Sequence, residues 1–271
     1  MRLRLQHLML QRLPCEHGAS IQHLSFKITS MHIHLVSIFP SIFDSFLETS
    51  LIKKAIDKKL ITIDVLDPRS FVPGKGQYVD DEIYGGGAGM LIKAKPIIDS
   101  VESIVSRIAG RITRKTKSAT HDLRSDFRII YLSPSKQIFT QKLAHAYADV
   151  QHIIFVCGRY EGIDNRFLEY MSDKYPKNFE TLSIGKFITL GGEAPAMTVI
   201  ESIVRLVPGV IKDAKSRQDE SYSLQYDMKN IEYPQYTRPE EVLGYKVPEI
   251  LLGGHHKNIE ERRKKKIKKM R

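Results

Sequence analysis

The chain has 271 residues, of which 42% are apolar and 27% charged, proportions typical of a folded globular protein. This length and composition exclude a disulfide-stapled mini-protein and a wholly disordered chain. The 42 Lys and Arg residues exceed the 31 Asp and Glu residues, and the resulting net charge of +11 fits either nucleic-acid binding or a solvated basic surface.

Cysteine content and hydropathy bear on the cellular location of the protein. Cys15 and Cys157 are too few for a disulfide framework and lack metal-ligand spacing, so a cytoplasmic location is expected. No apolar run approaches the roughly 18 residues that a membrane-spanning helix needs, so no membrane association is expected.

Residues 1–30 differ from the rest of the chain, because they are basic, contain a single acid and scatter their apolar residues. We expect them to lie outside the fold. Such a leader is typical of an organellar transit peptide, of a start codon assigned too far upstream or of an added extension.

From Met31 onward, short β-branched apolar runs alternate with longer amphipathic stretches. This alternation predicts an α/β protein with a mainly parallel sheet. The expected strands are 32–39, 61–66, 128–132 and 152–157, and the expected helices are 41–59, 95–108, 140–148 and 193–206.

Two polar stretches interrupt this alternation. Residues 110–126 are rich in Lys, Arg, Ser and Thr and predict an exposed basic insertion. Residues 210–240 have little periodicity and predict a flexible linker, a type of segment that often carries function. The chain then ends in a run of Lys and Arg that, on a helix, would suit a phosphate backbone, although a solvated, frayed terminus has the same composition.

Three loops follow expected strands: Ser133-Pro134-Ser135, residues 158–164 and residues 184–193. The carboxyl ends of parallel strands collect ligands, and glycine lets the backbone approach a ligand closely. One such loop would be an ordinary turn, but three in succession predict one composite pocket. Neither a G-x-G-x-x-G fingerprint after the first strand nor a phosphate-binding P-loop is present, so a standard dinucleotide or P-loop site is not expected.

Two further features concern possible ligands. A glycine cluster, residues 84–90, follows the acidic pair Asp80-Asp81 and predicts a loop that a large partner approaches, with a flexible surface turn as the alternative. His255-His256 has no partner at metal-ligand spacing, so His256 is expected to face RNA or to be structural. No metal site is expected.

Taken together, these segments resemble the TrmD family of bacterial tRNA (guanine-N1)-methyltransferases, of the SPOUT class. The resemblance runs in order from Met31 to about Arg263. The matching segments are 37–40, 79–81, 84–90, 131–134, 157–164, 183–185, 191–193, 195–197, 208–210, 236–239 and 247–248.

The resemblance implies an α/β fold in which a mainly parallel sheet carries a C-terminal trefoil knot, the SPOUT fold, followed by a small helical C-terminal domain. It implies a methyltransferase domain at 31–209, a linker carrying the general base at 210–238 and a short basic tRNA-binding domain at 239–271. The implied partners are tRNA and a second copy of the chain in a homodimer. Physics alone would not propose a knot, because knotted chains are rare.

The implied reaction moves a methyl group from S-adenosylmethionine to N1 of guanine 37, the base on the 3′ side of the anticodon. A dependence on Mg²⁺ stays open. The resemblance assigns the cofactor to Ser133, Pro134, Gly158, Tyr160, Glu161, Ile184, Gly185, Lys186, Phe187, Ile188, Thr189 and Gly191. It assigns the tRNA substrate to Asp80, Tyr84, Gly89, Arg205, Ser221 and His256.

The reaction explains the catalytic residue types. Guanine N1 holds its proton at neutral pH, so a carboxylate must remove that proton during methyl transfer. A cation such as Arg205 can stabilise the negative charge that develops on O6. The family has Glu-Asp-Ser-Phe where this chain has Asp219-Glu220-Ser221-Tyr222. Alignment on Ser221 makes Glu220 the general base, whereas a one-residue shift makes it Asp219.

Two other functions fit the same sequence. Another SPOUT RNA methyltransferase would modify a ribose or a different base. A basic RNA-binding protein on an inactive scaffold would fit the net charge, the short C-terminal segment and the altered base motif, and it would not bind S-adenosylmethionine.

Overall fold

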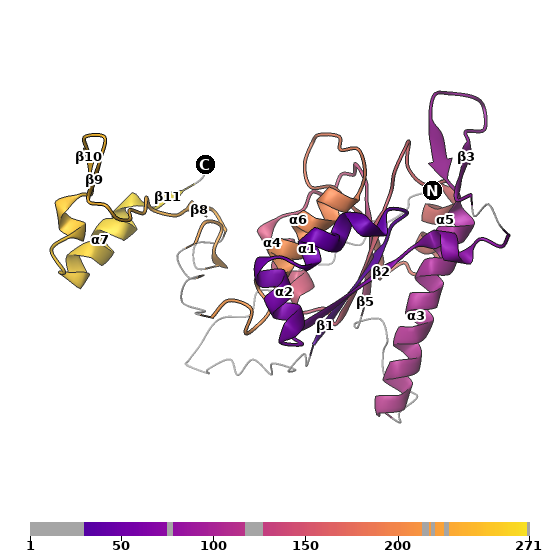
Figure 1. The fold of residues 1–271 in the computed structure, drawn as a ribbon, viewed down its shortest axis with the longest axis horizontal. Coiled ribbons are helices and arrows are strands. Elements are labelled where there is room, and N and C mark those ends of the chain that lie inside the picture. Colours follow the sequence, from indigo (N-terminus) through magenta and orange to yellow (C-terminus); the bar gives the residue numbers. More distant parts are fainter. Residues whose placement is uncertain are drawn as a thin grey trace, which may run out of the picture.

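The computed structural model describes residues 30–74, 78–116, 127–212, 217, 220–224 and 228–269. The expectations for residues 1–29, for 117–126 of the basic insertion and for Asp219 therefore lie outside the described residues. Figure 1 shows a central sheet with helices on both faces. This confirms an α/β fold with a mainly parallel sheet.

The sheet has five strands in the order β2-β1-β6-β5-β7, and all neighbouring pairs are parallel. Every residue of β6, at the centre, is buried, as expected for an apolar strand covered on both faces. β7 was not predicted, because its four residues include Glu and Thr and show no clear alternation of apolar and polar side chains. The strands are β1 (Met31–Val36), β2 (Ile61–Leu66), β5 (Phe127–Leu132), β6 (His152–Cys157) and β7 (Phe179–Leu182).

Helices α1, α2, α4 and α6 cover one face of the sheet, and α3 and α5 cover the other (Figure 1). Each face has its own core, with Phe43 and Phe155 fully buried in the first and Ile97 and Phe167 in the second. The α-helices of these two layers are α1 (Asp44–Leu47), α2 (Ser50–Asp57), α3 (Ala94–Thr116), α4 (Gln141–Ala148), α5 (Arg166–Lys174) and α6 (Glu193–Val204).

The prediction of a single helix over residues 41–59 is wrong. A 3-10 turn, η1 (Pro40–Phe43), precedes α1, and the chain breaks again before α2. Thr49 is extended, with ψ 141°, and Ser50 has a φ of 52°. The Thr49 hydroxyl donates to the Ser45 carbonyl, and such local bonds from Ser and Thr compete with a continuous helix.

Helix α3 is longer than the sequence indicated. It continues through residue 116 and so includes the first part of the stretch expected to be an insertion. The 3-10 turn η2 (Pro68–Phe71) packs on α3.

A β-hairpin outside the sheet carries the glycine cluster. Strands β3 (Asp80–Glu82) and β4 (Met90–Ile92) pair antiparallel. Gly85, Gly86, Gly87 and Gly89 between them have positive φ, which glycine adopts without strain. The glycine cluster is therefore the tip of a hairpin.

The C-terminal segment contains one α-helix among short strands. Strands β9 and β10 pair as a hairpin, and β11 returns to pair antiparallel with β8. Among the described residues, no helix is long and apolar enough to cross a membrane. The elements are β8 (Asn230–Ile231), β9 (Glu241–Val242), β10 (Tyr245–Lys246), the 3-10 turn η6 (Glu249–Leu251), α7 (His256–Lys266) and β11 (Lys268–Lys269).

Candidate active site

The three predicted loops meet at the carboxyl edge of the sheet, as their positions after β5, β6 and β7 require. The Ser133 amide after β5 donates to the Leu182 carbonyl at the end of β7, at 3.1 Å. The Gly192 amide donates to the Gly158 carbonyl at 2.9 Å, so the third loop is attached to the second. The loops form one continuous wall.

This wall encloses a cavity of about 270 Å³. Of the residues assigned to the cofactor, Gly185 and Lys186 do not line it, and the others do. Sequence reasoning missed lining residues within the strand ends and the same loops. The missed residues are Tyr131, Leu132, Arg159, Gly162, Leu182, Ser183, Leu190, Gly192 and Pro195.

Little space for a side chain remains where these segments touch. A Cβ on Gly192 would lie 2.8 Å from the Cys157 Cα, which is backbone and cannot rotate away. A Cβ on Gly158 would lie 3.1 Å from the hydroxyl oxygen of Tyr131. Burial raises the pKa of Tyr131, so this hydroxyl stays protonated beneath the loop.

A buried charge cluster lies beneath the cavity wall. Glu193, the first residue of α6, is fully buried. It accepts a hydrogen bond from Ser37 Oγ at 2.7 Å and one from Arg159 Nε at 2.8 Å. Arg159 also lies over the Phe39 ring, 5.0 Å from its centroid. The cluster joins the end of β1, the loop after β6 and the start of α6, and sequence reasoning missed it, since its only signal is an acid after two glycines.

The hairpin β3–β4 packs on the second loop. The Glu161 amide donates to the Met90 carbonyl at 3.1 Å, and the Ile92 amide donates to the Gly162 carbonyl at 3.0 Å. Gly89 has a φ of 89°, and a Cβ there would lie 2.7 Å from Glu161 Cγ, so the backbone conformation and this contact both favour glycine. Asp80 lies in β3, and Tyr84 near the hairpin tip is 96% exposed.

The two catalytic residues favoured by the sequence are paired. Arg205, at the end of α6, donates from both terminal nitrogens to the Glu220 carboxylate, with Nη1 3.0 Å from Oε1. This pairing raises the pKa of Arg205. His145 on α4 lies close enough to this pair to feel its charges. Burial is the main cause that lowers the pKa of His145, and the positive charge of Arg217 lowers it further. Ser221 Oγ accepts a hydrogen bond from the Glu232 amide at 3.1 Å.

The Arg205–Glu220 pair and the cavity lie apart within one chain. Neither Arg205 nor Glu220 lines the cavity. The cavity wall holds the start of α6 and Arg205 follows its end, and a helix of 12 residues is about 18 Å long. One chain therefore does not bring the pair next to the cavity.

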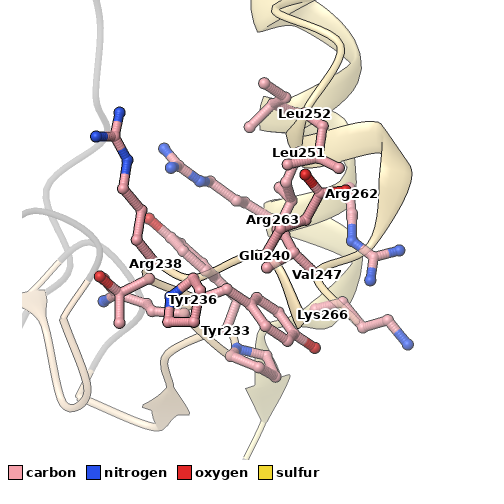
Figure 2. Close-up of a pocket in the computed structure, with 15 residues that line it drawn as sticks. Tyr233, Tyr236, Arg238, Glu240, Val247, Leu251, Leu252, Arg262, Arg263 and Lys266 are labelled. Carbon is pink, nitrogen blue, oxygen red and sulfur yellow. The ribbon is translucent and has the colours of Figure 1, made fainter. Parts of the chain in front are cut away.

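A larger cavity, about 940 Å³, lies in the C-terminal segment. Figure 2 shows Tyr233 and Tyr236 beside the basic residues of α7 that line it. The Arg263 guanidinium lies 5.1 Å from the Tyr233 ring centroid. His256, the exposed first residue of α7, does not line this cavity. The basic lining residues are Arg238, Arg262, Arg263 and Lys266, with Glu240 as the acid.

An open parallel sheet whose glycine loops enclose a cavity at the carboxyl edge defines an α/β protein that binds a small ligand there. Within the described ranges, no three His, Cys, Asp or Glu residues come together as a metal site. The family model described as tRNA (Guanine-1)-methyltransferase TrmD matches residues 31–271, and the chain belongs to this family.

Relatives named tRNA (guanine-N(1)-)-methyltransferase align over most of both chains. The protein from Carboxydothermus hydrogenoformans is 42% identical over 235 residues, which cover 87% of this chain and 82% of the relative. The protein from Listeria innocua serovar 6a is 40% identical over 235 residues, covering 87% and 86%. The protein from Dictyoglomus turgidum is 40% identical over 240 residues, covering 88% and 86%.

Proposed function

We propose that this chain transfers the methyl group of S-adenosylmethionine to N1 of guanine 37, next to the anticodon of tRNA. The observation that carries the proposal is the Arg205–Glu220 pair in a chain of the TrmD family. The pair brings together the carboxylate and the cation that this reaction needs.

The cavity at the carboxyl edge suits S-adenosylmethionine. Its volume of about 270 Å³ lies just below the usual range for small-molecule sites, roughly 300–1,000 Å³. The absence of side chains at Gly158 and Gly192 lets the adenosine approach the main chain of the wall closely, and the Glu161 carboxylate suits a ligand that carries positive charge. When bound, S-adenosylmethionine supplies an electrophilic methyl group. The residues that would hold it are the loop residues assigned from the sequence that line the cavity.

Glu220 acts as the general base in this proposal. Its carboxylate removes the proton from guanine N1, which makes N1 nucleophilic. Arg205 stabilises the negative charge that develops on O6. Because Arg205 holds the carboxylate by two hydrogen bonds, both groups are oriented before the base arrives.

The active site is completed in a homodimer. The separation of about one helix length between the cavity and the pair supports this, because a second copy can bring its pair to the first copy's cavity. Exposed apolar side chains beside the cavity also support it, since such patches mark interaction surfaces. These are Phe187 at 58%, Ile188 at 79% and Leu190 at 91% exposure.

The path of the third loop supports a trefoil knot. β7 lies beyond β5 in the sheet, whereas Gly192 pairs with Gly158 after β6. Residues 183–192 must therefore cross the carboxyl end of β5. The Ser183 amide donates to the Gln137 carbonyl, and the Phe139 amide donates to the Ser183 carbonyl, so the loop after β5 holds this segment.

tRNA contacts extend to the C-terminal domain, residues 239–271, joined by the linker 210–238 to the methyltransferase domain 31–209. The basic lining of the larger cavity and the charge of α7 support contact with a phosphate backbone. Asp80, Tyr84 and Gly89 on the β3–β4 hairpin, with Ser221 and His256, are the other proposed tRNA contacts. The free, buried Cys157 is compatible with a cytoplasmic location.

The test is methyl transfer to tRNA bearing guanine at position 37, followed by mass mapping of the modified base. We expect N1-methylguanine at that position and a loss of transfer in Glu220→Gln at unchanged affinity for S-adenosylmethionine. Glu48→Gln, which changes an exposed carboxylate paired with Lys53, is the control and should keep full activity. Full activity of Glu220→Gln would move the base to Asp219.

Other outcomes identify the alternatives. Methylation at another base or a ribose would make the chain a different SPOUT RNA methyltransferase. RNA binding without any calorimetric signal for S-adenosylmethionine would make it an RNA-binding protein on an inactive scaffold. Either result would overturn the proposal.

A further inference from the structure

The backbone around Glu220 forms a tight turn. The Ser223 amide donates to the Glu220 carbonyl at 3.2 Å, which closes the turn over residues 220–223. Tyr222 within it has a φ of 60°, a left-handed conformation that is unfavourable for a non-glycine residue. Such a residue persists only where its surroundings over-determine the backbone. The contacts that hold this turn therefore decide where the Glu220 carboxylate lies.

Asn230, the first residue of β8, supplies those contacts. Its Nδ2 donates to the Glu220 carbonyl at 2.9 Å, and its Oδ1 accepts from the Ser223 amide at 3.0 Å. Its own carbonyl accepts from the Tyr222 amide at 3.0 Å. Three polar groups of one residue thus bind three residues of the turn. The side chain is fully buried, so it does not reach a bound substrate.

Asn230 is itself held in place by the end of the chain. β8 pairs antiparallel with β11, with Asn230 opposite Lys269 and Ile231 opposite Lys268. Two residues after Asn230, the Glu232 amide donates to Ser221 Oγ at 3.1 Å, so a second contact joins the turn to the strand. The turn is therefore attached to a strand pair.

We infer that Asn230 is a positioning residue that sets the location of Glu220 for proton removal from guanine N1. This rests on the proposed function of Glu220. A group that must act within hydrogen-bond reach loses rate steeply when displaced, about 100-fold for a displacement of about 1 Å. Asn230 is buried and touches neither substrate itself, so it acts on catalysis through the turn that carries Glu220.

The experiment measures single-turnover methyl transfer at saturating S-adenosylmethionine and tRNA. Asn230→Asp keeps the acceptor for the Ser223 amide but places an oxygen against the Glu220 carbonyl, and Asn230→Ala removes both contacts. We expect each variant to transfer methyl roughly 10- to 100-fold more slowly at saturating substrates, with the Kd for S-adenosylmethionine within about twofold of the wild type. The two variants provide independent tests should one fail to fold.

Asn178 provides a matched control. It is also a buried asparagine, and its Nδ2 donates to the Phe127 carbonyl at 2.8 Å, far from Glu220 in the sequence. Asn178→Ala should lower the melting temperature and leave the single-turnover rate of the folded protein within about twofold. An equal loss of rate in Asn178→Ala and Asn230→Ala would identify a general effect on stability and overturn the inference.

The double variant gives the sharpest result. If Asn230 acts through Glu220, then Asn230→Ala should barely slow a Glu220→Gln protein further, because the group that it positions no longer works. Multiplicative losses in the double variant, or a wild-type rate in Asn230→Ala, would refute the positioning role. An inactive wild-type protein would instead refute the proposed function, so the two failures are distinguishable.

Discussion

Replacing Glu193 with Ala should destabilise the whole domain. The Glu193 side chain is fully buried and Arg159 is 19% exposed, so the substitution leaves a largely buried guanidinium without its carboxylate. Ser37 Oγ loses its acceptor as well. Breaking a buried pair from one side costs about 3–5 kcal/mol, a large part of the roughly 5–15 kcal/mol that stabilises a protein.

Urea unfolding followed by far-UV circular dichroism measures this loss. With a slope of roughly 3 kcal/mol per molar urea, the midpoint of Glu193→Ala should fall by about 1 M or more. Glu48→Ala, which removes a carboxylate from the exposed pair with Lys53, should leave the midpoint unchanged. Equal midpoints for wild type and Glu193→Ala would refute the reasoning, because they would mean that Arg159 loses nothing when its partner is removed.

Two further predictions concern His34 and Gly192. Burial first, then Arg107 and Arg111, lower the pKa of His34 from 6.5 to about 4, and the exposed Asp64, 3.4 Å away, does not offset this. The folded state therefore keeps His34 neutral. The contribution of His34 to the free energy of unfolding should be complete above pH 6.5 and should decline as the pH falls toward 4, by at most about 3 kcal/mol. An equally steep decline in His34→Gln would exclude His34 as the cause. Gly192→Ala places a methyl group against backbone and should lower the melting temperature and weaken S-adenosylmethionine binding, which thermal shift with and without the cofactor measures.

The sequence predicted the sheet better than the irregular segments. The apolar run of β6 predicted this central strand with correct bounds, because burial on both faces leaves a continuous apolar signal. The edge strand β2 was also predicted with correct bounds, from apolar residues that alternate with Thr62 and Asp64. The break at Ser50 was missed, since a left-handed residue leaves no trace in apolar periodicity. β8 and β11 were missed as well, because two-residue strands have no period.

For the candidate site, too, the sequence predicted some features and missed others. Glycine loops after strands predicted one cavity, since parallel strands end at one edge and their loops must meet. Lining residues such as Tyr131 lay within a predicted strand, where a side chain that faces a ligand resembles one that faces the core. The family resemblance pointed to Arg205 and Glu220, but only the structure shows that the two side chains pair. The Glu193 cluster joins segments distant in sequence, and the contacts of Asn230 form only when the turn at 220–223 packs on β8, so both emerge only from the folded chain.

The contact between Gly158 and Gly192 affects how the site could respond to an inhibitor. The Gly192 amide is engaged by the Gly158 carbonyl, and an added Cβ at Gly192 meets the Cys157 Cα. An inhibitor that recognises the shape of this wall would contact main chain that every viable variant must keep. Resistance would then have to arise elsewhere, for example through increased production of the protein or through side chains at the open rim, such as Phe187 and Leu190.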